Sequence, residues 1–459
     1  MAQPAMSETA APQADAAASS TAPPPSAAEE IVEVEGQAVE GWRLELRADE
    51  ELRSRVSLEP DESDVDARLY LGASAATPDE AFSGDLALGL WWDIDGLPDT
   101  GTPTGLSQVR QLDEPPLWFD VYALSAAYQS RGLLRAARVG RLSIDRGLPL
   151  LLDGASVELA PIARYLELFV YGGRSVHFFE LDAGLFEDWV ASVGVASRPL
   201  RDLRLELDYR FQWESTERIE GMIDHGYGLG AWYRLDDWAR LRAYLRGIDD
   251  ALAFAGGALQ VQWPSQELGA ELRVHAQTTE LRELNELDNP FFLTLGPSRP
   301  YLRWKADAWK AFSSAFGTYS LHLGGDGRHL VDGGESPFNR DFGRLYAMAQ
   351  AVDIVVDGPF AMLVLARHGE RFDFAGHGVW AVTGSAGYQA RAWRVEAGSA
   401  YDSYKYTYYQ SVDELQDVLT LFADAQVRPF DLLSVRVRYA YERFAWDVHT
   451  LTFGLSQVF

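Results

Sequence analysis

The chain ends with the eleven residues His449-Thr450-Leu451-Thr452-Phe453-Gly454-Leu455-Ser456-Gln457-Val458-Phe459. Successive side chains of an extended strand point to opposite faces, so every second residue shares a face. One face of this segment carries Leu451, Phe453, Leu455 and Phe459, and the other carries Thr450, Thr452, Gly454 and Ser456. The pattern therefore predicts a β-strand with one apolar face and one small or polar face, ending on a phenylalanine.

The same segment resembles the C-terminal assembly signal of Gram-negative outer-membrane β-barrels, in which a polar residue and a glycine precede hydrophobic residues that end in phenylalanine. The resemblance is carried by Leu451, Phe453, Gly454, Leu455 and Phe459. Gln457 departs from it, because a hydrophobic residue is usual at that place. The resemblance implies recognition by the barrel assembly machinery, an outer membrane location after signal peptide removal, and contact with lipids and lipopolysaccharide. The alternative is the edge strand of a soluble β-protein.

Alternation of this kind recurs from Gly41 onward. It is clearest from Leu203 to Glu214, where large apolar residues alternate with charged residues and Gln212. A charged side chain facing lipid costs about 2–4 kcal/mol at the bilayer centre, so we expect the charged face to line the interior. The sequence thus predicts an all-β fold, a transmembrane antiparallel β-barrel of about 22 strands, with 18 or 20 as alternatives.

The lengths of the expected connections support this count. Counted backward from a periplasmic Phe459, the connections at one end of the barrel are all short, as periplasmic turns of bacterial barrels are. The long connections, expected at 95–117, 176–187, 214–225, 281–299 and 326–340, all fall at the other end. The first two strands are expected at 41–48 and 65–75, which leaves acidic residues in an outer connection: Glu50, Glu51, Glu59, Asp61, Glu62 and Asp64.

Composition sets further bounds. Residues 1–38 are rich in Ala, Ser and Pro and are expected to form a disordered periplasmic tail, with the barrel occupying 39–459. The formal net charge of −28 argues against a nucleic-acid partner, since phosphates need a basic surface. The chain has no cysteine and no run of eighteen apolar residues, which excludes disulfides and a transmembrane helix.

No catalytic motif stands out, so we expect neither an enzyme nor a cofactor. Asp93, Asp95 and Asp99 are acidic enough to hold a weakly bound Ca²⁺ between outer loops, although a solvated turn is the more common role of such a segment.

The segment Arg138 to Val157 resembles the Gly-Arg … Asp-Gly hairpin of alginate-export-type barrels and related porins. That resemblance implies that Arg141 projects toward the pore and pairs with acidic neighbours; a structural ion pair is the alternative. The pore-lining residues expected from it and from the alternation are Arg141, Arg204, Glu206, Asp208, Arg210, Arg240, Arg242, Arg246, Arg303, Lys305, Asp307, Arg436, Arg438 and Glu442.

These features predict a channel for passive passage of polar or anionic solutes, with exopolysaccharide export as one use. Two alternatives stay open: a scaffold barrel filled by a partner protein or serving adhesion, and a TonB-linked receptor that lacks a plug. Barrels of this size are usually plugged, so a plug or periplasmic partner is also expected.

Overall fold

The computed structural model describes residues 38–39, 42–58, 61–95, 117–144, 150–162, 165–176, 189–216, 219–279, 299–332, 341–370, 372, 378–407, 413–443 and 447–459.

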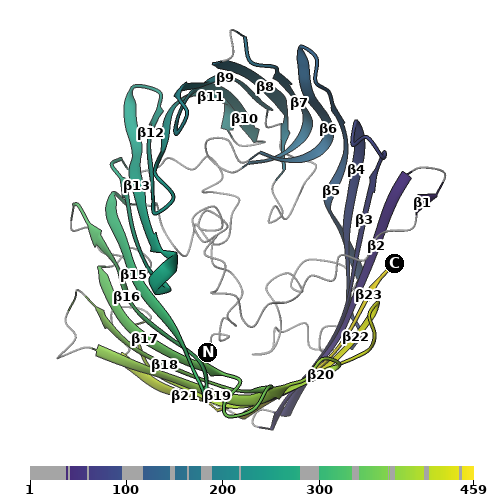
Figure 1. The fold of residues 1–459 in the computed structure, drawn as a ribbon, viewed down its shortest axis with the longest axis vertical. Helices are drawn as coiled ribbons and strands as arrows, with labels where there is room; N and C mark the ends of the chain where they lie inside the picture. The colour runs from purple at the N-terminus through teal and green to yellow at the C-terminus, as the bar shows by residue number, and fades with distance from the viewer. Residues whose placement is uncertain are drawn as a thin grey trace.

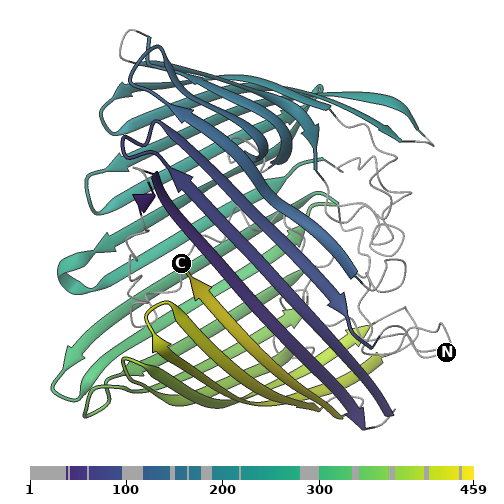
Figure 2. The same ribbon diagram turned by 90° about the vertical axis from the view of Figure 1, so that its right-hand side faces the viewer.

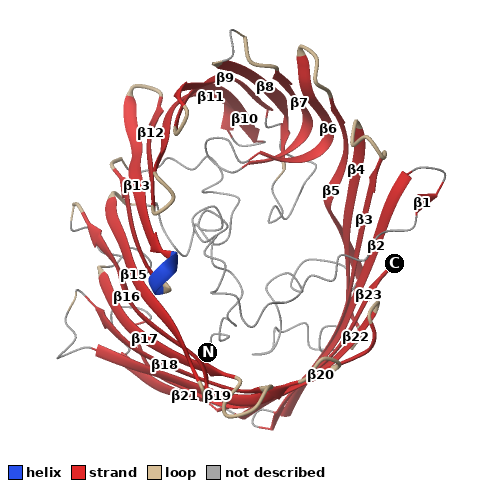
Figure 3. Cartoon of the chain, viewed as in Figure 1, coloured by secondary structure: helices blue, strands red, loops and turns tan. Residues whose placement is uncertain are grey.

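The described strands form one antiparallel sheet of 23 strands. β1 (Ala38–Val39) is a two-residue segment that pairs only with β2 (Trp42–Leu58). The other 22 strands, β2 to β23, form a closed barrel (Figure 1), so the predicted fold class and strand number are confirmed. The single described helix is a short 3₁₀ turn at Pro264–Gln266 (Figure 3) and is not long or apolar enough to cross a membrane.

The remaining strands are β3 (Asp61–Ala76), β4 (Phe82–Asp93), β5 (Leu117–Gln129), β6 (Leu134–Ile144), β7 (Leu150–Leu159), β8 (Leu166–Ser175), β9 (Trp189–Leu200), β10 (Leu203–Thr216), β11 (Ile219–Leu235), β12 (Ala239–Ile248), β13 (Ala251–Trp263), β14 (Leu268–Gln277), β15 (Tyr301–Ser314), β16 (Gly317–Leu330), β17 (Phe342–Val352), β18 (Pro359–Glu370), β19 (Gly378–Gln389), β20 (Trp393–Thr407), β21 (Asp413–Phe430), β22 (Leu433–Arg443) and β23 (Asp447–Val458).

The C-terminal strand closes the barrel. β23 pairs with β22 on one side and with β2 on the other, where the register runs from Arg47↔Val458 to Ser57↔Val448. The backbones of Leu46 and Phe459 exchange two further hydrogen bonds of 2.8 and 3.0 Å. Figure 2 shows β2 and β23 side by side in the wall, with the strands steeply tilted. Closure matters because a lipid-exposed sheet edge would leave backbone polar groups without partners.

The two ends of the barrel differ in their connections. Those on the side of Phe459 span 77–81, 130–133, 160–165, 201–202, 236–238, 264–267, 315–316, 353–358, 390–392 and 431–432. The longest connections lie at the opposite end, as predicted.

The turn at 77–81 is held by its own side chains. The Thr77 hydroxyl and the Ala81 amide donate to the Asp79 carboxylate, at 2.7 and 3.1 Å, and lower its pKa.

Two outer connections are shorter than the sequence suggested. β10 and β11 continue to Thr216 and from Ile219, so the loop expected at 214–225 is mostly strand. β2 likewise continues to Leu58, and β3 begins at Asp61. The acidic residues expected in that connection are therefore wall residues, apart from Glu59, which lies outside the described residues. The expectation failed because charged residues on an inward face do not end a strand.

The two faces of the wall differ as predicted for the barrel. On β10, Leu205 and Leu207 are 38% and 56% exposed on the outer face, while Glu206 and Asp208 between them are 4% and 8% exposed on the inner face. Exposed aromatic side chains mark both rims, as interfacial girdles do. Examples at the periplasmic rim are Trp42, Phe82, Tyr165, Phe316, Phe430 and Phe459, and at the outer rim Trp92, Phe119, Trp189 and Trp380.

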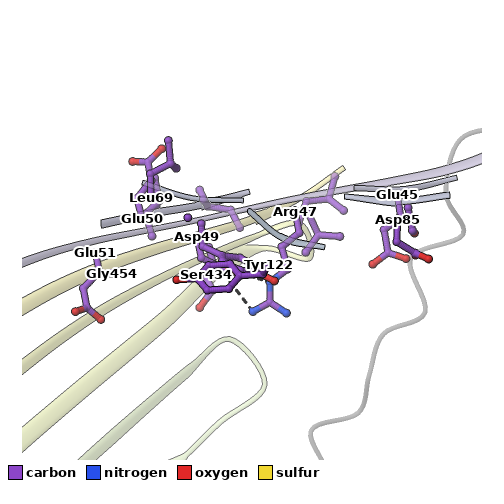
Figure 4. A pocket seen from close by; sticks show the side chains of 18 of the residues that line it. Glu45, Arg47, Asp49, Glu50, Glu51, Leu69, Asp85, Tyr122, Ser434 and Gly454 are labelled. Carbon is purple, nitrogen blue, oxygen red and sulfur yellow. Dashed lines mark hydrogen bonds and ion pairs between the residues drawn. The ribbon is translucent and has the colours of Figure 1, made fainter. Parts of the chain in front are cut away.

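Glu50 is an exception on the outer face. It pairs across the sheet with Leu69 and Leu455, and it is exposed. Figure 4 shows Glu50 and Leu69 on the opposite side of the sheet from Glu51 and Asp85. No hydrogen bond or ion pair joins the Glu50 carboxylate to another described residue. A carboxylate in this position costs stability in a bilayer.

We expect Glu50→Leu to stabilise the barrel by about 1–2 kcal/mol, since the acid is removed from the lipid face. Reversible urea unfolding in phospholipid vesicles would measure the free energy of unfolding. Glu51→Leu is the matched control, because Glu51 faces inward beside Arg68 at 3.7 Å, and it should not stabilise. Equal effects of the two variants would contradict the outward assignment.

Deletion of Phe459 should slow assembly of the barrel in the outer membrane, because it removes the last backbone pair of the closing seam and an apolar contact of the rim. The readout is the fraction of heat-modifiable protein in the outer membrane. Deletion of Met1 to Ala10 is the control and should leave that fraction unchanged. If the variant without Phe459 gives the same fraction of heat-modifiable protein as the unaltered chain, Phe459 is not part of the assembly signal.

Candidate pore lining

Charged side chains of the inner face occur mostly as ion pairs. Along a strand, residues i and i+2 share a face, so a cation and a carboxylate at this spacing can pair on one wall. Five such pairs are described: Arg47–Asp49 at 2.6 Å, Arg204–Glu206 at 3.0 Å, Arg273–Glu271, Lys305–Asp307 at 3.4 Å, and Arg394–Glu396 at 2.8 Å. In each pair the two opposite charges compensate each other, so the wall at these positions carries little net charge.

Other pairs cross between strands. Arg246 on β12 donates to Asp208 on β10 at 2.5 Å, and both side chains are largely buried. Gly228 of β11 lies between them, and a Cβ there would meet the Arg246 guanidinium at 1.5 Å. Glycine at this position therefore leaves the room that lets the pair span the intervening strand.

β22 and β15 carry the other predicted residues. Arg436 donates to Asp424 at 2.7 Å, and the Arg438 guanidinium lies 5.7 Å from the Phe422 ring centroid. Asp307 also accepts the Tyr346 hydroxyl. Arg303 and Glu442 occupy inner-face positions and have interaction partners, and Arg210 lies against Gly226 of β11. The structure thus distributes the predicted residues around the wall and does not gather them in one cluster.

β12 places two inner-face arginines without a described carboxylate partner two positions apart, whereas Arg210 on β10 and Arg438 on β22 are single arginines of this kind. Its inner face carries Arg240, Arg242 and Arg246, of which only Arg246 has a carboxylate partner among the described residues. Arg240 and Arg242 are exposed to the lumen. The Arg242 guanidinium lies 5.6 Å from the centroid of the Trp232 ring, and that of Arg204 lies at the same distance from it. At Arg240 and Arg242 the inner face of β12 therefore carries positive charge that no described carboxylate compensates.

A cavity with a volume of about 1450 Å³ lies against β2 to β4, β22 and β23 (Figure 4). Its lining mixes both signs of charge and includes Arg43, Glu45, Arg47, Asp49, Asp85, Arg436 and Ser434. The β2 members of this lining are not among the residues predicted from the sequence, although Arg43, Glu45, Arg47 and Asp49 alternate with apolar residues, a pattern that indicates an inward face.

The acidic segment after β4 is only partly as expected. Carboxylate oxygens of Asp93 and Asp95 come within 4.8 Å of one another and of Asp64, while Asp99 lies outside the described residues. The guanidinium of Arg55 pairs with Asp64, so one of the three carboxylates is already neutralised. Asp95 also accepts the Val65 amide at 2.9 Å. These contacts account for the cluster as part of the ion-paired wall.

Arg141 differs from its expected position. It pairs with Asp153 at 2.7 and 2.6 Å, in agreement with the acidic neighbour that the resemblance implied. Its cross-strand partner on β5 is Leu124, which is 57% exposed on the outer face. Partners in a ladder share a face, so the register places Arg141 in the row of outward residues and not toward the pore.

No protein-family model matches the chain, and no curated protein matches it. Among solved structures it is similar to the P pilus usher (PapC) translocation pore, with a TM-score of 0.52, 7% identity, and coverage of 90% of this chain and 99% of that chain. This likeness shows the fold alone: the chain is a β-barrel of the outer-membrane type.

Lower-scoring matches are the outer membrane protein opdK from Pseudomonas aeruginosa (TM-score 0.44, 11% identity, 92% of this chain and 100% of that chain) and OccAB2 from Acinetobacter baumannii (TM-score 0.46, 11% identity, 93% and 99%). None of the three solved structures named here is an alginate-export-type barrel.

Asp208→Asn should destabilise the barrel by about 3 kcal/mol, because it leaves the largely buried Arg246 guanidinium without its counter-charge. The double variant Asp208→Asn/Arg246→Gln removes both charges and should recover much of the loss. Urea unfolding in vesicles measures both. If the double variant is no more stable than Asp208→Asn, the two side chains are not energetically coupled.

Proposed function

We propose that the protein is a passive outer-membrane channel for small polar solutes and that its inner wall favours anions. The closed barrel supplies a route across the bilayer, and the charged inner face supplies partners for hydrated solutes. Water and ions move along such a wall without any step that consumes energy.

The observation that carries the anion preference is the uncompensated pair of arginines on β12. Most other described wall cations have a carboxylate within ion-pair distance, so they contribute little net field. Arg240 and Arg242 have none, and in a passage bounded by a low-dielectric wall their field is focused on the solute. The net charge of −28 is summed over the whole chain, and solvent screens charges that lie farther than about 8–10 Å from the passage.

The proposed solute class is small and anionic. The guanidinium groups of Arg204 and Arg242 over the Trp232 ring provide fork-shaped donors that match carboxylate or phosphate oxygens. Arg204 is partly engaged by Glu206, so Arg242 is the donor available to a passing anion.

The reversal potential of single channels in a planar bilayer under a KCl gradient tests this proposal. We expect anion selectivity for the unaltered protein and a loss of the chloride-to-potassium permeability ratio by at least about twofold in Arg240→Gln/Arg242→Gln. Arg367→Gln is the control, since Arg367 lies on the outer face 4.5 Å from the Trp380 ring, and it should change nothing.

A cation-selective channel that the β12 substitutions leave unchanged would overturn the anion preference. A protein that inserts but stays electrically silent would instead favour the scaffold barrel.

A further inference from the structure

Two carboxylates face the cavity beside β2 to β4 without a described counter-charge. Glu45 and Asp85 both line this cavity and are both exposed, and no ion pair joins either of them to another described residue. Asp85 accepts a hydrogen bond from the Ser125 hydroxyl at 3.5 Å. Residues 1–42, which precede this part of the wall, contain no Lys, Arg or His, so that part of the chain cannot supply a cation either.

The register of the sheet brings these two carboxylates to one place. Glu45 of β2 is the partner of Ser74 on β3, and Ser74 is the partner of Asp85 on β4. Ladder partners share a face, and neighbouring strands lie about 4.8 Å apart, so the backbones of Glu45 and Asp85 are roughly 10 Å apart on the same face. The short side chain of Ser74 leaves room between the two acids. Figure 4 shows both carboxylates on one side of the sheet, opposite to Glu50.

The other charges that line the cavity are largely compensated. Arg428 and Asp431 lie at its periplasmic rim and carry opposite charges. Glu45 and Asp85 therefore give the inner face of the cavity a net negative charge. Four further arginines of the lining each have a carboxylate within ion-pair distance: Arg43 with Glu80, Arg47 with Asp49, Arg68 with Glu51, and Arg436 with Asp424.

The arginine pair of β12 lies at the same end of the barrel. Counted from the periplasmic end, Arg240 and Arg242 are the second and fourth residues of their strand, and Glu45 and Asp85 are each the fourth residue of theirs. β12 is nearly halfway around the barrel from β2, and Figure 1 shows the two strands on different sides of the lumen. Among the described residues, the periplasmic half of the passage thus has uncompensated positive charge on one wall and uncompensated negative charge on the other.

We propose that Glu45 and Asp85 form a contact site for the ammonium group of a solute, and that the channel admits small zwitterions, which carry an amino group and an anionic group together. This inference rests on the proposed function, in which Arg240 and Arg242 attract the anionic group. An ammonium group has N–H donors that two carboxylates accept in charge-assisted hydrogen bonds.

The two walls act together on a zwitterion because its opposite charges can point to opposite walls. In a passage with low-dielectric walls the field of unpaired charges is focused on the solute, so the positive wall orients the anionic group and the negative wall orients the ammonium group. A simple cation is attracted by the acids of β2 and β4 but repelled by the arginines of β12. The arrangement therefore favours a solute that carries both charges over one that carries positive charge alone.

Solute entry into proteoliposomes tests the ammonium site. The probes are 4-aminobutyrate, a zwitterion at neutral pH, and erythritol, an uncharged solute of similar size, each in an isosmotic swelling assay. The test variant is Glu45→Gln/Asp85→Asn, which keeps the shapes of both side chains and removes both charges. Asp353→Asn/Asp357→Asn is the matched control, because these two acids lie in the periplasmic turn 353–358 and do not line the cavity. Heat-modifiable, folded protein is used for every variant.

We expect the ratio of the 4-aminobutyrate rate to the erythritol rate to fall by at least about threefold in the test variant, because the ammonium group loses its acceptors. The erythritol rate should stay the same, and the control variant should keep both rates. The chloride-to-potassium permeability ratio in planar bilayers should rise in the test variant. An unchanged ratio of the two swelling rates, or an equal fall of both, overturns the ammonium site.

Failure of the proposed function gives a different result. A barrel that admits neither solute is not an open channel, and the ammonium site then fails with it. A barrel that admits erythritol, but whose ratio of rates is the same in the test variant as in the unaltered protein, is a channel without the ammonium site.

Discussion

Backbone hydrogen bonding in the bilayer is the constraint on which this structure depends. Lipid offers no partner to an N–H or C=O group, so a sheet that crosses it must have no free edge. Here the first long strand and the last one meet, and the backbones of Leu46 and Phe459 complete that ladder at the periplasmic rim. The alternation of apolar and polar residues follows from the same constraint, because every strand then has one face toward lipid and one toward the lumen.

Charge on the inner face is arranged by the two-residue period of the strand. A cation and a carboxylate two positions apart form an ion pair on the wall at little cost, and this arrangement recurs on β2, β10, β14, β15 and β20. The proposed anion preference rests on Arg240 and Arg242 of β12, which have no carboxylate partner among the described residues. A net charge summed over the whole chain therefore says little about the field that a solute meets.

Among the described residues, the ladder between β5 and β6 ends at Leu124↔Arg141, earlier than the ladders on either side of it. Beyond that point the Arg141 guanidinium donates to the Val121 carbonyl of β5 and pairs with Asp153 of β7. Glu50 on the outer face of β2 is the other departure from the general pattern.

The sequence by itself predicted the barrel and the end at which its long connections lie, because lipid enforces a period of two over every crossing. It gave about 22 strands with 18 or 20 as alternatives, and the structure decided for 22. It also identified Asp208, Arg246 and the β12 arginines as residues of the charged face. Only the tertiary structure decided how they pair, since Asp208 and Arg246 meet across an intervening strand at a glycine. The position of Arg141 and the early end of its ladder likewise depend on the path of a neighbouring strand, which no local pattern encodes.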